Sequence, residues 1–145
     1  MPPKSKQSTR GNNRLRSSLE TYCFDRLKAE GLDFMYEGEV FNLTPSFVYD
    51  GVYHKAMPKK KDLVCHSGKT VRPITYKPDF VSHKHKFIIE TKGYVRPNDS
   101  FPLRWKLFVH HIKEKYGDEY MLFIPKNREQ VDLCVDMIKL TAKTK

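Results

Sequence analysis

The amino-acid sequence predicts an α/β fold in which a central mixed β-sheet is flanked by helices. Three segments space their apolar residues at helical intervals, and short runs rich in β-branched and aromatic residues lie between them. The resulting order is helix, several strands, helix, strand, helix, which suits two or three packed layers around one sheet. At 145 residues the chain has the length of a single domain.

The first helix is expected to begin after Ser17. Ser17 and Glu20 have the spacing of a capping box, in which a serine and a glutamate three positions later satisfy the first free N–H groups. Apolar residues then recur four positions apart on the face that includes Cys23 and Leu27, which predicts a face directed at the core. Gly31 is a suitable residue for the helix end.

The region after the first helix is rich in strand-forming residues. Asp50-Gly51 lies between two short runs of this kind, and the pair is typical of a hairpin turn. Residues 54–73 carry many lysines and lack an apolar period, so we expect a basic loop there, with a short strand at Asp62–His66.

The second half of the chain predicts alternating strands and helices. Two strands, at about Ile74–Val81 and Lys86–Tyr94, are joined by a short connector that favours an antiparallel hairpin. A helix over Ser100–Tyr116 and a short buried strand over Tyr120–Ile124 follow. Asn127 is expected to cap a last helix. The apolar positions on the inner face of that helix are Val131, Cys134, Val135 and Ile138.

The charge balance predicts a polyanionic partner. The chain has 27 Lys and Arg against 17 Asp and Glu, for a net charge of +10, and nucleic acid is the commonest partner of such proteins. An anionic membrane is the rival, but the sequence has no apolar run of about 18 residues and no terminal basic amphipathic helix. We therefore expect DNA and no membrane.

The cysteine content indicates a reducing, intracellular compartment. Cys23, Cys65 and Cys134 are odd in number, far apart and never paired as CxxC, which disfavours both a disulfide framework and a structural zinc site. The basic N-terminus lacks the apolar stretch of a secretion signal. We expect a cytoplasmic protein, located in the host cytoplasm if it is encoded by a phage.

Charge also suggests how the chain is divided. Residues 1–16 are expected to be a flexible basic arm that either grips DNA or acts as a solubilising tail. Residues 17–140 are expected to form a single domain with a basic insertion at about 51–73, and residues 141–145 a basic tail. The expected phosphate contacts are Arg10, Arg14, Arg16, Lys59, Lys60, Lys61, Lys77, Arg104 and Lys106.

The chemistry is suggested by Pro78-Asp79 on one expected strand and Glu90-Thr91-Lys92 on the next. Side chains alternate along a strand, so Glu90 and Lys92 share a face, and a short hairpin can place Asp79 beside Glu90. Two adjacent carboxylates repel each other unless a cation lies between them, and oxygen ligands favour Mg²⁺ or Mn²⁺. A solvent-exposed strand with a Glu-x-Lys face is the alternative explanation.

These motifs resemble the PD-(D/E)xK nuclease superfamily and, within it, the phage endonuclease I family of Holliday-junction resolvases. The matching stretches run from Arg16 to Glu20, Phe34 to Glu37, Pro78 to Phe80 and Ile89 to Gly93, and the resemblance extends from Arg16 to about Ile124. The chain departs from the family in its basic insertion and in lacking a long C-terminal extension.

The resemblance implies a restriction-endonuclease-like core and a set of catalytic residues. These residues are Glu20, Asp79, Glu90 and Lys92. Asp79, Glu90 and the backbone carbonyl of Thr91 would hold Mg²⁺, with Mn²⁺ able to substitute, and Glu20 would be an additional ligand. Glu20 could instead serve only as a capping-box residue, and Glu37, where the family often has an acid, could be a solvent-facing strand residue.

The resemblance also implies a DNA endonuclease that resolves branched DNA in recombination. Family members are homodimers with exchanged elements, so Glu20 of one chain could join Asp79, Glu90 and Lys92 of the other. Two alternatives stay open. One is a nicking or restriction-like nuclease acting on ordinary duplex or fork DNA, and the other is a non-catalytic DNA-binding or packaging protein with the same fold.

Overall fold

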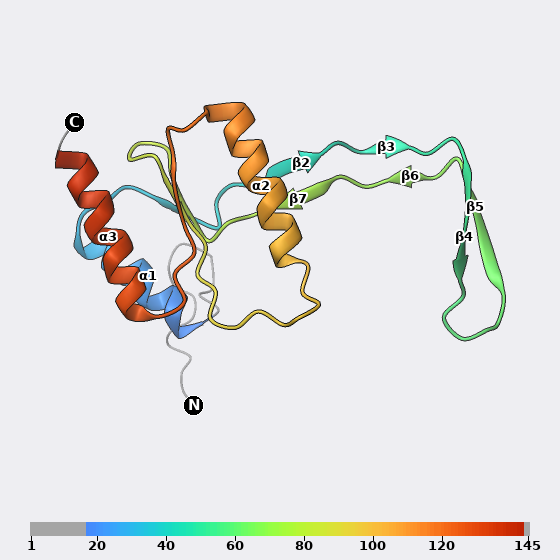
Figure 1. The fold of residues 1–145 in the computed structure, drawn as a ribbon, viewed down its shortest axis with the longest axis horizontal. Coiled ribbons are helices and arrows are strands. Elements are labelled where there is room, and N and C mark those ends of the chain that lie inside the picture. Colours follow the sequence, from blue (N-terminus) through green and yellow to red (C-terminus); the bar gives the residue numbers. More distant parts are fainter. Residues whose placement is uncertain (1–16, 144–145) are drawn as a thin grey trace. The chain divides into compact units, whose positions relative to one another are not determined.

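The computed structural model describes residues 17–143, which form two compact units (Figure 1). The described part of the first unit comprises residues 17–40 and 77–143, and the second unit is Phe41–Tyr76. The basic arm predicted at residues 1–16, with Arg10, Arg14 and Arg16, lies outside the described residues. The insertion expected at 51–73 lies within the second unit, which extends beyond it at both ends.

The described part of the first unit contains three helices and one four-stranded mixed sheet, which confirms the predicted α/β class. The helices are α1 (Ser18–Ala29), α2 (Phe101–Tyr116) and α3 (Arg128–Lys143). The strands are β1 (Met35–Tyr36), β8 (Phe80–Ser82), β9 (Phe87–Ile89) and β10 (Met121–Phe123), in the order β1-β8-β9-β10. Strand β8 is antiparallel to both its neighbours, whereas β10 runs parallel to β9.

Helices cover both faces of this sheet, so the first unit has three layers: α1 and α3 lie on one face and α2 on the other (Figure 1). Phe80, Phe87 and Ile89 belong to a buried cluster with residues of α1 and α3. Val81 and Ile88 alternate with them, point to the opposite face, and are also buried. A strand buried on both faces has no polar alternation, which explains the continuous apolar run in β9.

The helix boundaries follow from local signals that the sequence reveals. The Ser17 side chain accepts a hydrogen bond from the Glu20 N–H at 3.1 Å, and Asn127 accepts one from the Gln130 N–H at 2.9 Å. Gly31 adopts a φ of +70° just after α1, a conformation that glycine adopts without strain. Helix α3 continues to Lys143, so residues 141–143 are helical rather than part of a tail. None of the described helices is long and apolar enough to cross a membrane.

Helices α1 and α3 pack directly against each other. Cys23 and Leu27 of α1 share the buried cluster with Cys134 and Val135 of α3. At the edge of this contact, Asp132 accepts hydrogen bonds from the Tyr22 hydroxyl and the Arg26 guanidinium, both at 2.8 Å. The first and last described helices of the chain therefore form one layer.

Two predicted strands are shorter than expected. The strand expected at Ile74–Val81 is in fact β7 (Ile74–Tyr76) in the second unit and β8 in the first, separated by Lys77, Pro78 and Asp79. Proline lacks the N–H that a strand interior requires, which explains the break. The strand expected at Lys86–Tyr94 ends at Ile89. The Glu90 and Lys92 N–H groups nevertheless donate to the Phe123 and Pro125 carbonyls at 2.9 and 3.1 Å, which prolongs the pairing beyond β9.

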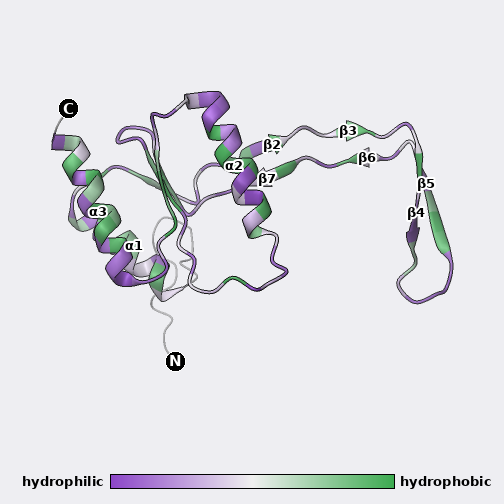
Figure 2. Ribbon diagram, in the orientation of Figure 1, coloured by the Kyte–Doolittle hydropathy of each residue, from purple (hydrophilic) through white to green (hydrophobic). Residues whose placement is uncertain are grey.

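The second unit is a long antiparallel hairpin, which we call the ribbon. Three strand pairs follow one another along it: β2 (Phe41–Thr44) with β7, β3 (Phe47–Val48) with β6 (Thr70–Val71), and β4 (Val52–Ala56) with β5 (Leu63–Ser67). Most side chains of β4 and β5 are exposed, although β5 is hydrophobic and β4 largely hydrophilic (Figure 2).

The ribbon corrects two predictions. Residues 54–73 form regular strands around a tip at residues 57–62, so the expected basic loop is wrong, although the short strand expected at Asp62–His66 is present as β5. Asp50-Gly51 is not a hairpin turn, because β3 and β4, which flank it, pair with β6 and β5 rather than with each other. The dipeptide instead forms a bend between two successive strands.

Candidate active site

Asp79 and Glu90 lie side by side at one end of the β8–β9 pair. Asp79 immediately precedes β8 and Glu90 immediately follows β9, and the pairing of Phe80 with Ile89 brings them together. The Asp79 N–H donates to Glu90 Oε1 at 3.2 Å, and both side chains are buried. The adjacency expected from the short connector is therefore present.

Thr91 fixes the orientation of the Asp79 carboxylate. Asp79 Oδ2 accepts two hydrogen bonds from this residue, one from its N–H at 2.9 Å and one from its hydroxyl at 2.7 Å. The sequence suggested only the Thr91 carbonyl as a metal ligand and missed this contact. The sequence did contain a signal for this contact. Because Thr91 follows Glu90 directly, the strand pairing that brings Glu90 to Asp79 also brings Thr91 close to Asp79.

Glu20 reaches the same place from α1. Its side chain is buried, and Glu20 Oε2 accepts a hydrogen bond from the Tyr36 hydroxyl at 2.8 Å. Its backbone N–H, rather than its carboxylate, takes part in the Ser17 cap. The capping role therefore does not account for the side chain, which is directed to the interior of the first unit.

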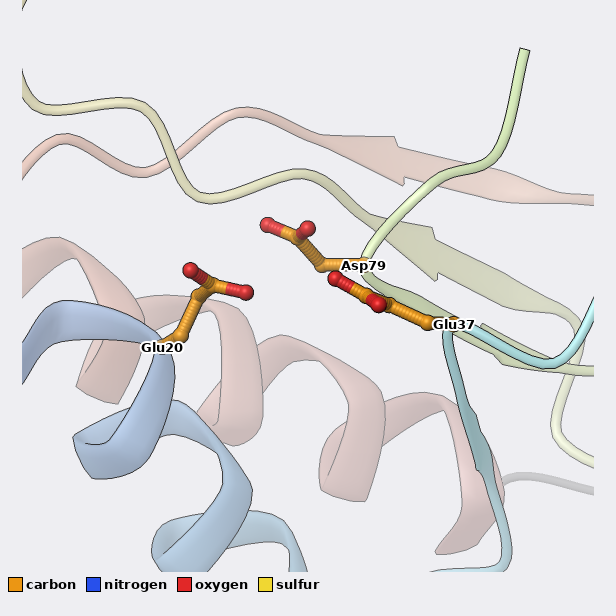
Figure 3. Close-up of side chains that lie close together, drawn as sticks. All are labelled: Glu20, Glu37 and Asp79. Carbon is orange, nitrogen blue, oxygen red and sulfur yellow. The ribbon is translucent and has the colours of Figure 1, made fainter. Parts of the chain in front are cut away.

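Glu37 adds a further carboxylate to this cluster. Glu37 follows β1 with a φ of +47°, and its N–H donates to the Asp79 carbonyl at 2.8 Å. One carboxylate oxygen from each of Glu20, Glu37 and Asp79 lies within 4.8 Å of the others, and the three side chains converge from separate elements (Figure 3). The Nζ atom of Lys77, a residue that the sequence predicts to contact DNA, lies 3.9 Å from Glu37 Oε1.

The crowding of carboxylates changes the acidity of Asp79. Burial and the charges of Glu90 and Glu20 raise the pKa of Asp79 to about 7, against the opposing effect of the Thr91 hydrogen bonds. At neutral pH the site thus holds negative charge that the surrounding protein compensates poorly. A bound cation would relieve this repulsion, and the donor set consists of carboxylate oxygens, which suit a hard divalent ion.

Lys92 places a positive charge at the margin of the cluster. Its Nζ lies 3.7 Å from Glu90 Oε2 and 4.7 Å from the centre of the Phe101 ring at the start of α2. The side chain is partly exposed, so the ammonium group borders both the carboxylates and solvent. This arrangement allows Lys92 to contact a bound anion beside the carboxylates.

The structure brings together Glu20, Asp79, Glu90 and Lys92 within one chain, and it adds Glu37, which the sequence indicated only weakly. The three carboxylates with oxygens within 4.8 Å of one another include Glu37 and not Glu90. Among the expected phosphate contacts, Lys106 is exposed on α2 and Arg104 partly buried there, whereas Lys59, Lys60 and Lys61 are exposed at the ribbon tip.

Comparisons of the chain with models of known families, with curated proteins and with solved structures find no match. The function is therefore inferred from the fold and from the geometry of the site.

Proposed function

We propose that this protein is a Mg²⁺-dependent DNA endonuclease with a PD-(D/E)xK core, acting on branched DNA as a phage-type Holliday-junction resolvase. One observation carries the proposal. The buried carboxylates of Glu20, Asp79 and Glu90 and the half-buried carboxylate of Glu37 converge from α1 and from the ends of β1, β8 and β9, and Lys92 lies beside them. A purely structural role would not require several buried acids, and burial together with the charges of Glu90 and Glu20 raises the pKa of Asp79.

The arrangement of the carboxylates supports a metal site. Thr91 engages Oδ2 of Asp79 and Tyr36 engages Oε2 of Glu20, so both carboxylates are held in place while Oδ1 and Oε1 can face an ion. The proposed ligands are Asp79, Glu90, Glu20 and the Thr91 carbonyl, with Glu37 as a fifth group. A divalent cation supplies Lewis-acid stabilisation of the phosphate charge and lowers the pKa of a water molecule.

The remaining parts of the site would bind and orient the DNA. Lys92, at the solvent margin, would contact a scissile phosphate and stabilise the negative charge that develops during hydrolysis. The net charge of +10 would hold the DNA backbone through contacts that depend on shape and charge rather than on base sequence.

The test is a cleavage assay on matched substrates. A labelled four-way junction, a nicked duplex and a linear duplex are incubated with the full chain in Mg²⁺, Mn²⁺, Ca²⁺ or EDTA. We expect paired cuts in the junction with Mg²⁺ or Mn²⁺ and none with Ca²⁺ or EDTA, because the looser geometry of Ca²⁺ suits catalysis poorly. Undiminished cleavage in EDTA would refute the metal site. Equal cleavage of the linear duplex would favour the nicking or restriction-like alternative, and binding without cleavage the packaging alternative.

Paired cuts require two active sites held together, which a homodimer supplies most simply. Glu20 and Asp79 of the same chain already meet, so the site can be built without exchange of elements. Co-refolding a Glu20→Ala chain with a Glu90→Ala chain separates the two arrangements. With sites formed within each chain the mixture stays inactive, whereas exchange between chains would restore nicking.

A further inference from the structure

The ribbon carries a row of aromatic rings on one face. The Tyr53 and His66 rings are stacked, with centroids 5.0 Å apart and planes 16° from parallel, and the Tyr49 ring lies 6.1 Å from that of Tyr53. Tyr53 and Tyr49 are both more than two-fifths exposed. We call Tyr49, Tyr53 and His66 the aromatic row.

The backbone of the ribbon sets this row in place. Tyr53 pairs with His66 across β4 and β5, and directly opposed residues of an antiparallel pair point to the same face. A Cβ atom added at Gly51 would lie 2.5 Å from the Tyr49 hydroxyl oxygen. The absence of a side chain at Gly51 therefore leaves room for the Tyr49 ring to lie over the backbone at this bend.

The ribbon that carries the row is rich in cations. Lys55 lies two residues after Tyr53 on the same strand and so shares its face, and the Lys69 carbonyl accepts a hydrogen bond from the Tyr49 N–H at 3.1 Å. Asp50 and Asp62 are the only acids in the ribbon sequence. Its cations are Lys55, Lys59, Lys60, Lys61, Lys69 and Arg72.

We propose that the aromatic row binds unpaired bases of single-stranded DNA, with Lys55 contacting the adjacent phosphates. Exposed rings flanked by cations are the combination that binds single strands, because unpaired bases stack on the rings while the backbone stays near the positive charges. The bases of an intact duplex already stack on one another and present no free face. The choice of DNA rests on the proposed function, since a branched substrate offers unpaired bases where its strands separate.

Charge disfavours a second copy of the ribbon as the occupant of this face. Two ribbons placed face to face would bring Lys55 and its neighbouring cations together, and like charges in contact are unfavourable. A single strand of DNA supplies both the phosphates and the flat bases that the face complements.

Binding of the full chain to labelled oligothymidylate and to a hairpin duplex, measured by fluorescence anisotropy in EDTA, tests the proposal. Tyr53→Ala should weaken single-strand binding by about fivefold to a hundredfold, which is the contribution of one stacked base. Tyr53→Phe keeps the ring and should bind within about twofold of the unaltered chain. Val52→Ala, next in sequence but on the other face and 53% exposed, should change nothing.

Several results would overturn the proposal. Equal losses for single-stranded and duplex DNA would show that the face senses only charge. A changed oligomeric state of Tyr53→Ala with unaltered affinity would show that the row joins two copies. The anisotropy assay is run in EDTA and measures binding alone, so its result does not depend on whether the carboxylate site cleaves DNA. Failure of the proposed binding by the aromatic row can therefore be distinguished from failure of the proposed nuclease activity.

A second measurement keeps the proposal testable if Tyr53→Ala unfolds the ribbon. Single-stranded DNA carrying 5-iododeoxyuridine is irradiated with the unaltered chain, and the crosslinked peptides are identified by mass spectrometry. We expect adducts on Tyr49, Tyr53 or His66. Adducts confined to the first unit would overturn the assignment.

Discussion

The first unit and the ribbon use β-strands in opposite ways. In the first unit, helices cover both faces of the sheet, so Phe87, Ile88 and Ile89 are completely buried and the carboxylates at the strand ends lie in a shielded site. In the ribbon, every residue of β4 and most of β5 are exposed, and backbone pairing maintains the shape. Burial tunes the acidity of Asp79 in the first unit, whereas exposure in the ribbon leaves side chains accessible to a partner.

The largest difference between the units should appear in catalysis. Lys92→Ala should lower single-turnover cleavage by about 10²- to 10⁴-fold while DNA binding survives, because many other cations hold the backbone. Lys60→Ala removes the same charge from the ribbon tip and should cleave nearly normally. If both variants lost activity equally, or if Lys92→Ala lost binding but kept normal turnover, Lys92 would be only a phosphate contact.

The second-largest difference between the two units should appear in the effect of substitutions on stability. Phe87→Ala removes a ring from the fully buried face beneath α1 and α3 and should lower the free energy of unfolding by about 3–5 kcal/mol. Val52→Ala in the exposed ribbon should change it by less than about 0.5 kcal/mol. Urea denaturation followed by circular dichroism measures both. A comparable loss for Val52→Ala would show that the ribbon face is buried in the folded protein.

The pH dependence of stability sharpens the contrast. Because the pKa of Asp79 is raised from 3.8 to about 7, the folded state holds a proton that the unfolded chain releases at lower pH. The stability from this proton is complete below about pH 4 and lost as the pH rises through about 7. The metal-free protein should therefore melt at a lower temperature at pH 8 than at pH 5, with an effect on the order of a few kcal/mol.

Two variants and one ion check the origin of this effect. Asp79→Asn should abolish most of the pH dependence and raise the melting temperature at pH 8, and Mg²⁺ should stabilise the unaltered chain more at pH 8 than at pH 5. Asp132 provides a control of opposite sign, because its hydrogen bond with Arg26 lowers its pKa. Asp132→Asn should destabilise the protein at neutral pH. A flat profile for the unaltered chain would contradict the crowding of carboxylates.

The smallest effect concerns the ribbon tip. Replacing Lys59–Lys61 together with alanine should weaken duplex binding and make its salt dependence shallower, by about 0.9 in logarithmic slope for each phosphate that the tip no longer neutralises. The control variant replaces Lys28, Lys84 and Lys113, which are exposed in the first unit, with alanine. It has the same net charge as the ribbon-tip variant. Identical decreases in affinity for the two variants would show that overall charge, rather than the ribbon tip, governs binding.

The sequence predicted those features of the first unit that depend on neighbouring residues. Ser17 and Asn127 mark helix starts because a cap acts within one turn, and the short connector before β9 limits which residues can oppose Asp79. The hydrogen bonds from Tyr36 to Glu20 and from Thr91 to Asp79 join separate elements. The strand pairing predicted from the sequence could have suggested the Thr91 contact, but no local pattern encodes the contact between Tyr36 and Glu20.

Apart from the short strand at Asp62–His66, the pairing of the ribbon was not predicted, because exposure removes the usual signal of a strand. Period-2 alternation arises when one face packs on a core, but both faces of β4 and β5 accept polar and apolar residues alike. Asp50-Gly51 then suggested a tight turn, although Gly51 instead leaves space for the Tyr49 ring as it lies in this structure.

The packing of α1 against α3 has a consequence for synthesis of the protein. Glu20 is carried by the first described helix, whose buried residues contact the last one, so this layer cannot form until residues 128–143 have left the ribosome. Contacts between distant parts of a chain also form slowly during folding. A nascent chain would therefore contain Asp79 and its strand before α3 is available to hold α1, and with it Glu20, in place. The carboxylate cluster would thus be completed only after residues 128–143 have been translated.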